Sequence, residues 1–295
     1  MELTHFGDKF VWFDGRIIPS EQATLHVLTH GLHYGSCVFE GERAYDGTVF
    51  KSRAHSQRLH QSAEILDFTI PFSVDALETA KAEIIARNGS GAKYVRAVAW
   101  RGGEKMMAIS AQQNVIHVAI ATWTWPSMFD PAERMRGIRL DIADYRRPDP
   151  ACAPSHAKAA GLYMICTVSK HRAERKGFAD ALMFDYQGRV AECTGANVFF
   201  IADGQIHTPI ADCFLSGITR ATVIDIARAR GLDVIERRIM PDELGSFSEC
   251  FITGSAAEVT PVREIAGTMY QPGRVTELLL TDYMQQTKAS QPTAG

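Results

Sequence analysis

The chain lacks the motifs and long apolar segments that mark several common classes of protein. It contains no Gly-x-Ser-x-Gly, Gly-x-Gly-x-x-Gly or Walker loop, so nothing points to a serine hydrolase, a dinucleotide enzyme or a P-loop ATPase. No apolar run approaches the roughly 18 residues needed to cross a bilayer. The first ten residues show no basic region followed by an apolar one, so a signal peptide is not expected.

Charge and cysteine usage are equally unremarkable. The net charge is −3, and Lys and Arg are spread along the chain, so neither a nucleic-acid stripe nor a membrane patch is expected. The six cysteines show no Cys-x-x-Cys spacing. Scattered cysteines in a long chain without a signal peptide are typical of reduced core residues. We therefore expect a cytoplasmic protein.

The histidines suggest a metal site only weakly. His26, His30 and His33 have helical spacing, and His55 and His60 are five apart. However, the chain has no His-Glu-x-x-His motif, and no cysteine or carboxylate stands beside these histidines at ligand spacing. We predict no metal.

The pattern of elements predicts an α+β protein of two domains. We expect a small N-terminal α/β domain over 1–122, an interdomain loop over 123–135 with two prolines, and a larger C-terminal domain over 136–295. In the first domain we predict helices over 53–67 and 74–87 and strands over 93–101 and 114–122. Alternation in strand 93–101 puts Tyr94 and Arg96 on one face. This pair could grip a carboxylate, or the strand could be an edge strand with a solvated arginine.

Lys158 lies in a stretch of small residues, 153–163, with His156 close by. A lysine in such surroundings could be held neutral and act as a nucleophilic amine towards a carbonyl compound. Most lysines are instead solvated surface charges. The choice between a catalytic lysine and a surface lysine therefore depends on the other chemically active residues of the chain.

Two turns offer donors for an anion. Ser216–Thr219 precedes a predicted helix over 219–230, and Thr253-Gly254-Ser255 follows a predicted strand. Free amides and the helix dipole favour an anion at such a turn, although plain helix capping explains the first turn as well. With Arg58 as a third contributor, the pattern suggests a phosphate. Glu192 is either a simple turn residue or a buried carboxylate that needs a partner, such as a protonated ring nitrogen.

Six stretches, in order and with similar spacing, resemble the signature of the branched-chain amino-acid aminotransferases, which are fold-type IV pyridoxal-phosphate enzymes. The resemblance spans roughly residues 10 to 285. The stretches are His30–Tyr45 with His55–Leu59, Tyr94–Arg96, Ala157–Tyr163, Glu192–Asn197, Gly217–Arg220 and Thr253–Val262.

The resemblance implies a reaction and a cofactor site. The reaction is transamination of L-leucine, L-isoleucine or L-valine with 2-oxoglutarate, giving branched 2-oxo acids and L-glutamate. Lys158 would hold pyridoxal 5'-phosphate covalently and then move a proton, while Glu192 would keep the pyridine nitrogen protonated. Tyr163 would bond the phenolic oxygen. The implied phosphate ligands are Arg58, Ile218, Thr219 and Ser255.

The resemblance also implies a substrate site. Tyr94 and the backbone near Ser255 and Ala256 would receive the α-carboxylate, and Arg96 would meet the side-chain carboxylate of glutamate. Phe39 and Trp125 would form an apolar wall. Tyr34 would come from a neighbouring subunit, which implies at least a homodimer.

The chain departs from the family pattern at Ala160-Gly161-Leu162, at Glu42, where an apolar residue is usual, and at Ser255, where threonine is commoner. These departures leave open a D-amino-acid or (R)-amine transaminase, or an aminodeoxychorismate lyase. A cofactor-free Schiff-base lyase would leave Glu192 unexplained, and a non-catalytic binding protein would be colourless.

Overall fold

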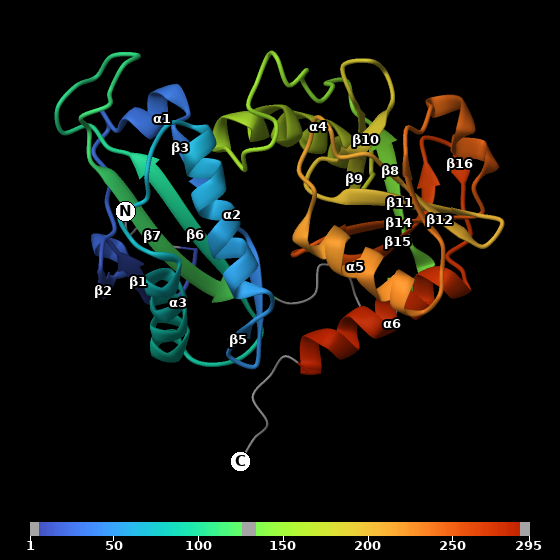
Figure 1. Cartoon of the computed structure of the whole chain (residues 1–295), viewed down its shortest axis with the longest axis horizontal. Coiled ribbons are helices and arrows are strands. Elements are labelled where there is room, and N and C mark those ends of the chain that lie inside the picture. Colours follow the sequence, from blue (N-terminus) through green and yellow to red (C-terminus); the bar gives the residue numbers. More distant parts are fainter. Residues whose placement is uncertain (1–5, 126–133, 290–295) are drawn as a thin grey trace. The chain divides into compact units, whose positions relative to one another are not determined.

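The computed structural model describes residues 6–125 and 134–289 and forms two compact units. The first unit contains residues 1–126, 157–161 and 287–295, and the second contains 127–156 and 162–286. Helices and antiparallel strands occur in both, which confirms the predicted α+β class (Figure 1). Among the described residues, no helix combines the length and the apolar character that a membrane span requires.

The first unit is built on a seven-stranded sheet in the order β2-β1-β7-β6-β4-β5, with β3 also paired to β6. Two short helices, η1 (Ser20–Gln22) and α1 (His30–Tyr34), lie in the connection between β2 and β3, and a turn at Asp46-Gly47 joins β4 to β5. The strands are β1 (Phe10–Phe13), β2 (Arg16–Pro19), β3 (Cys37–Phe39), β4 (Glu42–Tyr45), β5 (Thr48–Val49), β6 (Lys93–Arg101) and β7 (Ile116–Thr124).

Two helices, α2 (Ser52–Ile65) and α3 (Val74–Asn88), pack on one face of this sheet. Helix α3 begins where the sequence predicts, because the Ser73 hydroxyl accepts a hydrogen bond from the Ala76 amide, 3.1 Å away. It ends at Asn88 and is followed by Gly89, whose φ of 89° suits glycine. Leu59 on α2 and Leu77 on α3 are fully buried, so both helices are held by their apolar faces.

Strand β6 has the predicted bounds and alternation. Val95, Ala97 and Ala99 face the helices, which leaves Tyr94 and Arg96 on the other face. The edge-strand interpretation is wrong, because β6 pairs with β7 on one side and with β3 and β4 on the other.

The neighbouring strand, β7, runs to Thr124, two residues beyond its predicted end. The predicted interdomain loop lies largely outside the described residues, since only Trp123, Thr124, Trp125, Arg134 and Met135 of it are described.

The second unit is built on a nine-stranded sheet in the order β10-β9-β8-β15-β14-β11-β12-β13, with β16 paired to β15. Its strands are β8 (Ile138–Ile142), β9 (Asp180–Phe184), β10 (Val190–Cys193), β11 (Asn197–Ala202), β12 (Gln205–Pro209), β13 (Val234–Arg237), β14 (Glu249–Gly254), β15 (Glu258–Ile265) and β16 (Thr268–Met269). The remaining helices are η2 (Arg134–Arg136), η3 (Ala160–Leu162), α4 (Tyr163–Arg175), α5 (Ile218–Ala229), η4 (Pro241–Ser246) and α6 (Arg274–Ala289).

The core of this sheet is apolar and aromatic. Phe199 and Phe251 are fully buried and stack with their ring centroids 4.8 Å apart. We predicted no strand after the turn at Thr253-Gly254-Ser255, yet β15 follows it and is a central strand that pairs with both β14 and β8. Pro261 interrupts the strand pattern of that segment, and proline usually argues against a central strand.

Candidate active site

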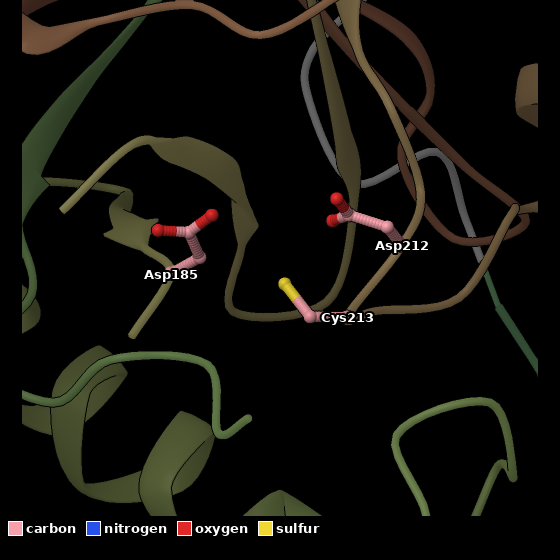
Figure 2. Close-up of side chains that lie close together, drawn as sticks. All are labelled: Asp185, Asp212 and Cys213. Atoms are coloured by element: carbon pink, nitrogen blue, oxygen red, sulfur yellow. The ribbon is translucent and has the colours of Figure 1, made fainter. Parts of the chain in front are cut away.

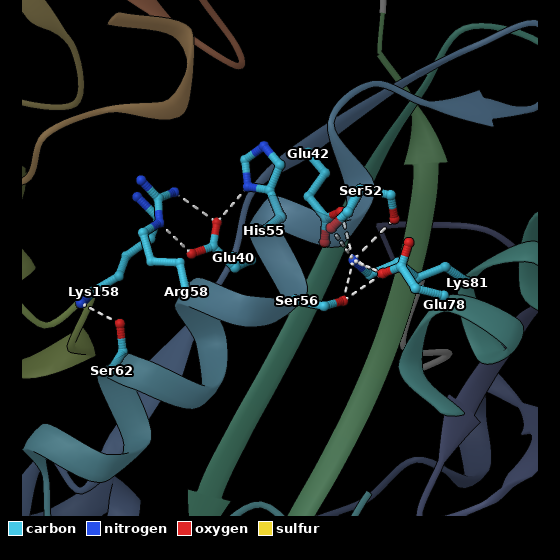
Figure 3. Close-up of polar contacts among 10 residues, drawn as sticks. All are labelled: Glu40, Glu42, Ser52, His55, Ser56, Arg58, Ser62, Glu78, Lys81 and Lys158. Atoms are coloured by element: carbon cyan, nitrogen blue, oxygen red, sulfur yellow. Dashed lines mark hydrogen bonds and ion pairs between the residues drawn. The ribbon is translucent and has the colours of Figure 1, made fainter. Parts of the chain in front are cut away.

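Lys158 is half-buried and belongs to the first unit, which holds its backbone at two points. Its amide donates to the Ser62 hydroxyl, 3.0 Å away (Figure 3). Its carbonyl accepts from the Phe39 amide, 3.1 Å away. The next residue, Ala159, forms a β-bridge with Val38. The Lys158 Nζ atom lies 5.0 Å from the centre of the Phe39 ring. A strand and a helix of one unit therefore fix the backbone of Lys158.

Arg58 projects from α2, four residues before Ser62, and meets a carboxylate that sequence reasoning missed. Its Nε and Nη2 atoms each donate to Glu40, at 2.7 Å, and His55 Nδ1 lies 2.6 Å from the same carboxylate. Glu40 is fully buried. Burial alone would raise the pKa of Glu40, but the charge and hydrogen bonds of Arg58, together with the bond to His55, hold it well below its usual range.

The face of β6 opposite helices α2 and α3 carries an arginine among aromatic rings. The Arg96 guanidinium lies 4.6 Å from the centre of the Phe39 ring and 5.5 Å from that of Tyr94. Tyr94 stacks on Trp123 at 4.9 Å and contacts Trp125 at 5.4 Å. The Arg96 Nε atom is buried and makes no hydrogen bond. A buried donor of this kind suits an anionic ligand.

Glycine at position 41 lets Tyr94 approach the chain, because a Cβ there would overlap the tyrosine hydroxyl. Sequence reasoning missed Trp123, which packs against Tyr94. Trp123 and Trp125 are two residues apart in an extended segment, and that spacing puts both rings on the same face. Tyr34 ends α1 and is 49% exposed.

In the second unit, Glu192 is a buried carboxylate with a cation beside it. The Arg147 Nε atom lies 3.2 Å from Glu192 Oε1, and the Asn197 amide donates to Oε2 at 3.2 Å. Glu192 is on β10, so the simple turn interpretation is wrong. Neither Arg147 nor Asn197 was identified from the sequence as a partner. The side chains come from separate strands and a loop, and only the fold brings them together.

Helix α5 begins with backbone amides that have no acceptor within the helix. Its N-cap is Gly217, which makes no side-chain capping bond, so the plain capping interpretation is wrong. Asn197 Oδ1 accepts from the Gly217 amide at 3.1 Å and would collide with a Cβ at that position. Ile218 and Thr219 form the first helical turn, whose amides have no intrahelical acceptor. Such amides suit a phosphate.

The other predicted residues of this unit lie at the ends of elements. Tyr163 is the first residue of α4, and Ser255 and Ala256 lie in the turn after β14, all three partly buried. The Thr253 hydroxyl, just before that turn, is buried without a hydrogen-bond partner.

A group of possible metal ligands also occurs in this unit. Among residues 6–125 and 134–289 it comprises Asp185, Asp212 and Cys213 (Figure 2). Arg189 Nε donates to Asp185 Oδ2 at 2.6 Å, and two backbone amides donate to Oδ1. Burial raises the pKa of the Cys213 thiol to about 12, so it stays protonated near neutral pH. These contacts describe a turn that is already satisfied by protein donors.

The predicted residues thus form two groups, one in each unit. Their donors fit pyridoxal phosphate, because they offer an amine, an arginine, helix-start amides and a buried carboxylate for a ring nitrogen. The first unit holds Tyr34, Phe39, Arg58, Tyr94, Arg96, Trp125 and Lys158, and the second holds Tyr163, Glu192, Ile218, Thr219, Ser255 and Ala256.

Comparison with known proteins agrees with this chemistry. The family model for amino-transferase class IV matches residues 37–265. The chain therefore belongs to the class IV aminotransferases, which places its two units in the fold-type IV group.

The relatives are more specific. The chain is similar to the branched-chain-amino-acid aminotransferase of Pseudomonas aeruginosa, with 38% identity over 94% of this chain and 92% of that protein. Its structure is similar to that of the T.th. branched-chain amino acid aminotransferase with pyridoxamine 5'-phosphate. In that comparison the TM-score is 0.93 and the identity 35%, covering 98% of this chain and 97% of that one. It is also similar to the enzyme of Escherichia coli, with a TM-score of 0.89 and 32% identity over 98% and 97% of the two chains.

Proposed function

We propose that this chain is a pyridoxal-phosphate-dependent transaminase that exchanges an amino group between L-leucine, L-isoleucine or L-valine and 2-oxoglutarate. The observation that carries the proposal is Lys158, a half-buried amine whose backbone is bonded on both sides, to Ser62 and to Phe39. It occurs in a class IV chain whose relatives are named for this reaction.

The two groups of residues divide the task of holding the coenzyme. Lys158 binds it covalently, and Arg58 and the first-turn amides of Ile218 and Thr219 hold its phosphate, with Ser255. Tyr163 donates to its phenolic oxygen. When bound, the coenzyme supplies an electron-withdrawing ring that makes the α-proton of an amino acid removable.

Three groups then control the proton movements. Glu192 would accept a hydrogen bond from the protonated ring nitrogen of the bound coenzyme, and the Arg147 Nε atom lies 3.2 Å from the same carboxylate. Once the amino acid has displaced it, the Lys158 amine would move a proton between the α-carbon of the amino acid and the coenzyme carbon bonded to the same nitrogen. The Lys158 Nζ atom lies 5.0 Å from the centre of the Phe39 ring, so the amine faces the apolar wall of the proposed pocket.

The face of β6 supplies a pocket for two different substrates. Phe39, Tyr94 and Trp125 offer apolar surface, and full burial of a branched aliphatic side chain contributes about 1.5–3 kcal/mol. Arg96 accepts the second carboxylate of glutamate or 2-oxoglutarate. Tyr94 and the turn at Ser255 and Ala256 receive the α-carboxylate.

The departure at Glu42 does not add a charge to this pocket, because Lys81 Nζ is 2.7 Å from the Glu42 carboxylate and both are buried. The named relatives favour the branched-chain substrates over D-amino acids, (R)-amines or aminodeoxychorismate.

The assignment is tested by the colour of the protein and by one lysine. The purified protein should be yellow, borohydride should abolish the visible band, and peptide mapping should place the label on Lys158. Lys158→Ala should bind the coenzyme yet fail to transaminate. Lys176→Ala, at an exposed lysine, is the matched control and should keep the band, the label and the activity. Normal turnover by Lys158→Ala would refute the assignment. A panel of L- and D-amino donors should show that the enzyme prefers L-branched-chain amino acids.

The proposal includes a cytoplasmic homodimer in which Tyr34 serves the neighbouring copy. Tyr34 is exposed, and so are several apolar residues before and within α1, an arrangement that favours association. They are Leu25, Val27, Leu28 and Leu32. All six cysteines are free thiols, in keeping with a reducing compartment.

Mixing subunits tests the sharing of the site. Tyr34→Ala and Lys158→Ala subunits are unfolded and refolded together, so that mixed dimers form. If Tyr34 acts on the neighbour, one site of each mixed dimer contains neither substitution and activity returns. If Tyr34 acts within its own chain, every site has one defect and activity stays low.

A further inference from the structure

Two fully buried carboxylates, Glu40 and Glu42, flank Gly41 and reach towards helix α2 (Figure 3). They have different partners. Glu40 meets Arg58 and His55, whereas Glu42 meets Lys81. A Glu→Gln substitution can therefore be made at either residue, and each change serves as the control for the other.

Glu40 fixes the orientation of the Arg58 guanidinium. Two parallel hydrogen bonds, from Nε to Oε1 and from Nη2 to Oε2, are both 2.7 Å long. Such a bidentate pair sets the plane of the guanidinium group as well as its position. His55 Nδ1, at 2.6 Å from Oε2 and itself buried, holds the carboxylate from a third direction. Arg58 is therefore held in one pose and not as a mobile surface cation.

The same short segment also holds the backbone of Lys158. Phe39, the residue before Glu40, donates its amide to the Lys158 carbonyl, and Val38 bridges to Ala159. On the opposite side, Ser62 of α2 accepts from the Lys158 amide one helical turn after Arg58. The segment 38–40 and helix α2 thus both hold Lys158, and helix α2 also carries Arg58. Within this segment, Glu40 is the residue whose side chain bonds to Arg58.

We propose that Glu40 is a positioning residue that sets the place of Arg58 relative to Lys158, so that the phosphate and the reactive carbon of one coenzyme are received together. This inference rests on the proposed function, in which Arg58 contacts the phosphate and Lys158 the carbonyl carbon. Glu40 itself touches neither. It acts through Arg58, and His55 keeps it in place.

The test compares pyridoxal phosphate with pyridoxal, which lacks the phosphate. Apoenzyme of the full chain is reconstituted with each compound, and both dissociation constants are measured by absorbance. Glu40→Gln should weaken pyridoxal phosphate binding about tenfold or more, because a charge-assisted bidentate contact becomes a neutral one. Binding of pyridoxal should change little, so the affinity ratio of the two compounds should fall.

Glu42→Gln is the matched control, because it neutralises an equally buried carboxylate two residues away. It should lower stability and leave the affinity ratio at the wild-type value. In the Arg58→Ala background, Glu40→Gln should have no further effect on the ratio. Should Glu40→Gln not fold, Glu40→Asp gives the same test, since the shorter side chain keeps the charge but breaks the bidentate register.

Two failures are distinguishable. If wild-type protein binds neither compound, the proposed function fails. If wild-type protein prefers pyridoxal phosphate and Glu40→Gln or Glu40→Asp keeps that preference, the positioning role is wrong and the transaminase assignment stands. Equal loss of the ratio in Glu40→Gln and Glu42→Gln would also overturn the role, since it would trace the effect to general loosening of the segment.

Discussion

Glu40 in the first unit and Glu192 in the second are both buried beside an arginine, but the protein holds them differently. Glu40 is fully buried and receives two bonds of 2.7 Å from Arg58. Glu192 retains slight exposure, and its contacts with Arg147 and Asn197 are both 3.2 Å long. Short bidentate pairing holds Glu40 and Arg58 in a fixed relative geometry, whereas the contacts of Glu192 with Arg147 and Asn197 are longer.

The difference separates two uses of a buried charge. In our proposals Glu40 positions Arg58 without touching the coenzyme, whereas Glu192 contacts the coenzyme itself. The Glu42–Lys81 pair is a third case, because Oε2 of Glu42 contacts Lys81 at 2.7 Å while Oε1 is buried without a hydrogen-bond partner. Lys81 is buried and also donates to Ser52, Ser56 and Glu78. Burial raises the pKa of Glu42 above its ordinary value, and the Lys81 ammonium opposes that rise.

The largest effect is expected on stability, from breaking the Glu42–Lys81 pair. Lys81→Met should lower the free energy of unfolding by about 3–5 kcal/mol, because it leaves a buried carboxylate without its cation. Lys93→Met, at a lysine whose partner Asp8 is partly exposed, should cost less. Glu42→Leu combined with Lys81→Met should recover most of the loss. Urea denaturation measures all three, and a double variant no more stable than Lys81→Met would contradict the pairing argument.

The second effect is on catalysis and concerns Glu192. Glu192→Gln should lower kcat by about 10²–10³-fold, the usual cost of removing one group that stabilises developing charge. The coenzyme should still bind, because its phosphate contacts are unchanged. Glu40→Gln should show the reverse pattern, with weakened binding and a smaller loss of kcat at saturating coenzyme. Equal losses of kcat in the two variants would erase the distinction between a positioning carboxylate and an acting one.

The third effect is on selectivity and concerns Arg96. Arg96→Leu should lower kcat/KM for 2-oxoglutarate by about 10- to 150-fold, because a charge-assisted hydrogen bond contributes roughly 1.5–3 kcal/mol. The half-reaction with leucine should change little, since its side chain meets aromatic surface. Arg96→Lys should be intermediate. Single-turnover measurements of each half-reaction check this, and an equal loss for leucine would place Arg96 at the shared α-carboxylate instead.

Sequence reasoning predicted local features well and long-range partners poorly. Strand β6 and the start of helix α3 followed from alternation and from the Ser73 cap, both of which act within a few residues. The family resemblance supplied the residue roles. Glu40 was within the recognised signature, yet its pairing with Arg58 joins a strand end to a helix 18 residues away. Arg147 lies 45 residues from Glu192, so no periodicity could have linked them.

The smallest effect contrasts two histidines. Burial alone would lower the pKa of His117 in the first unit, but its hydrogen bonds to Asp14 and Glu104 raise it. Burial and the Arg237 charge lower the pKa of His207 in the second unit. A raised pKa contributes stability below about pH 6.5, the unfolded value, and that stability is lost as pH rises through the folded value. A lowered histidine pKa acts in the opposite sense: the folded state holds the neutral form, so its contribution to stability is lost as pH falls.

His117→Asn should therefore destabilise the protein more at pH 5.5 than at pH 8.5, by less than about 1 kcal/mol, because the ion pairs are partly exposed. His207→Asn is the matched variant, and its cost should grow in the other direction, being larger at pH 8.5. Urea denaturation at both pH values gives the two differences. The carboxylates beside His117 favour its charged form, whereas the Arg237 guanidinium favours the neutral form of His207. If the stability cost of both substitutions changes with pH in the same direction, these local charges do not set the pH dependence.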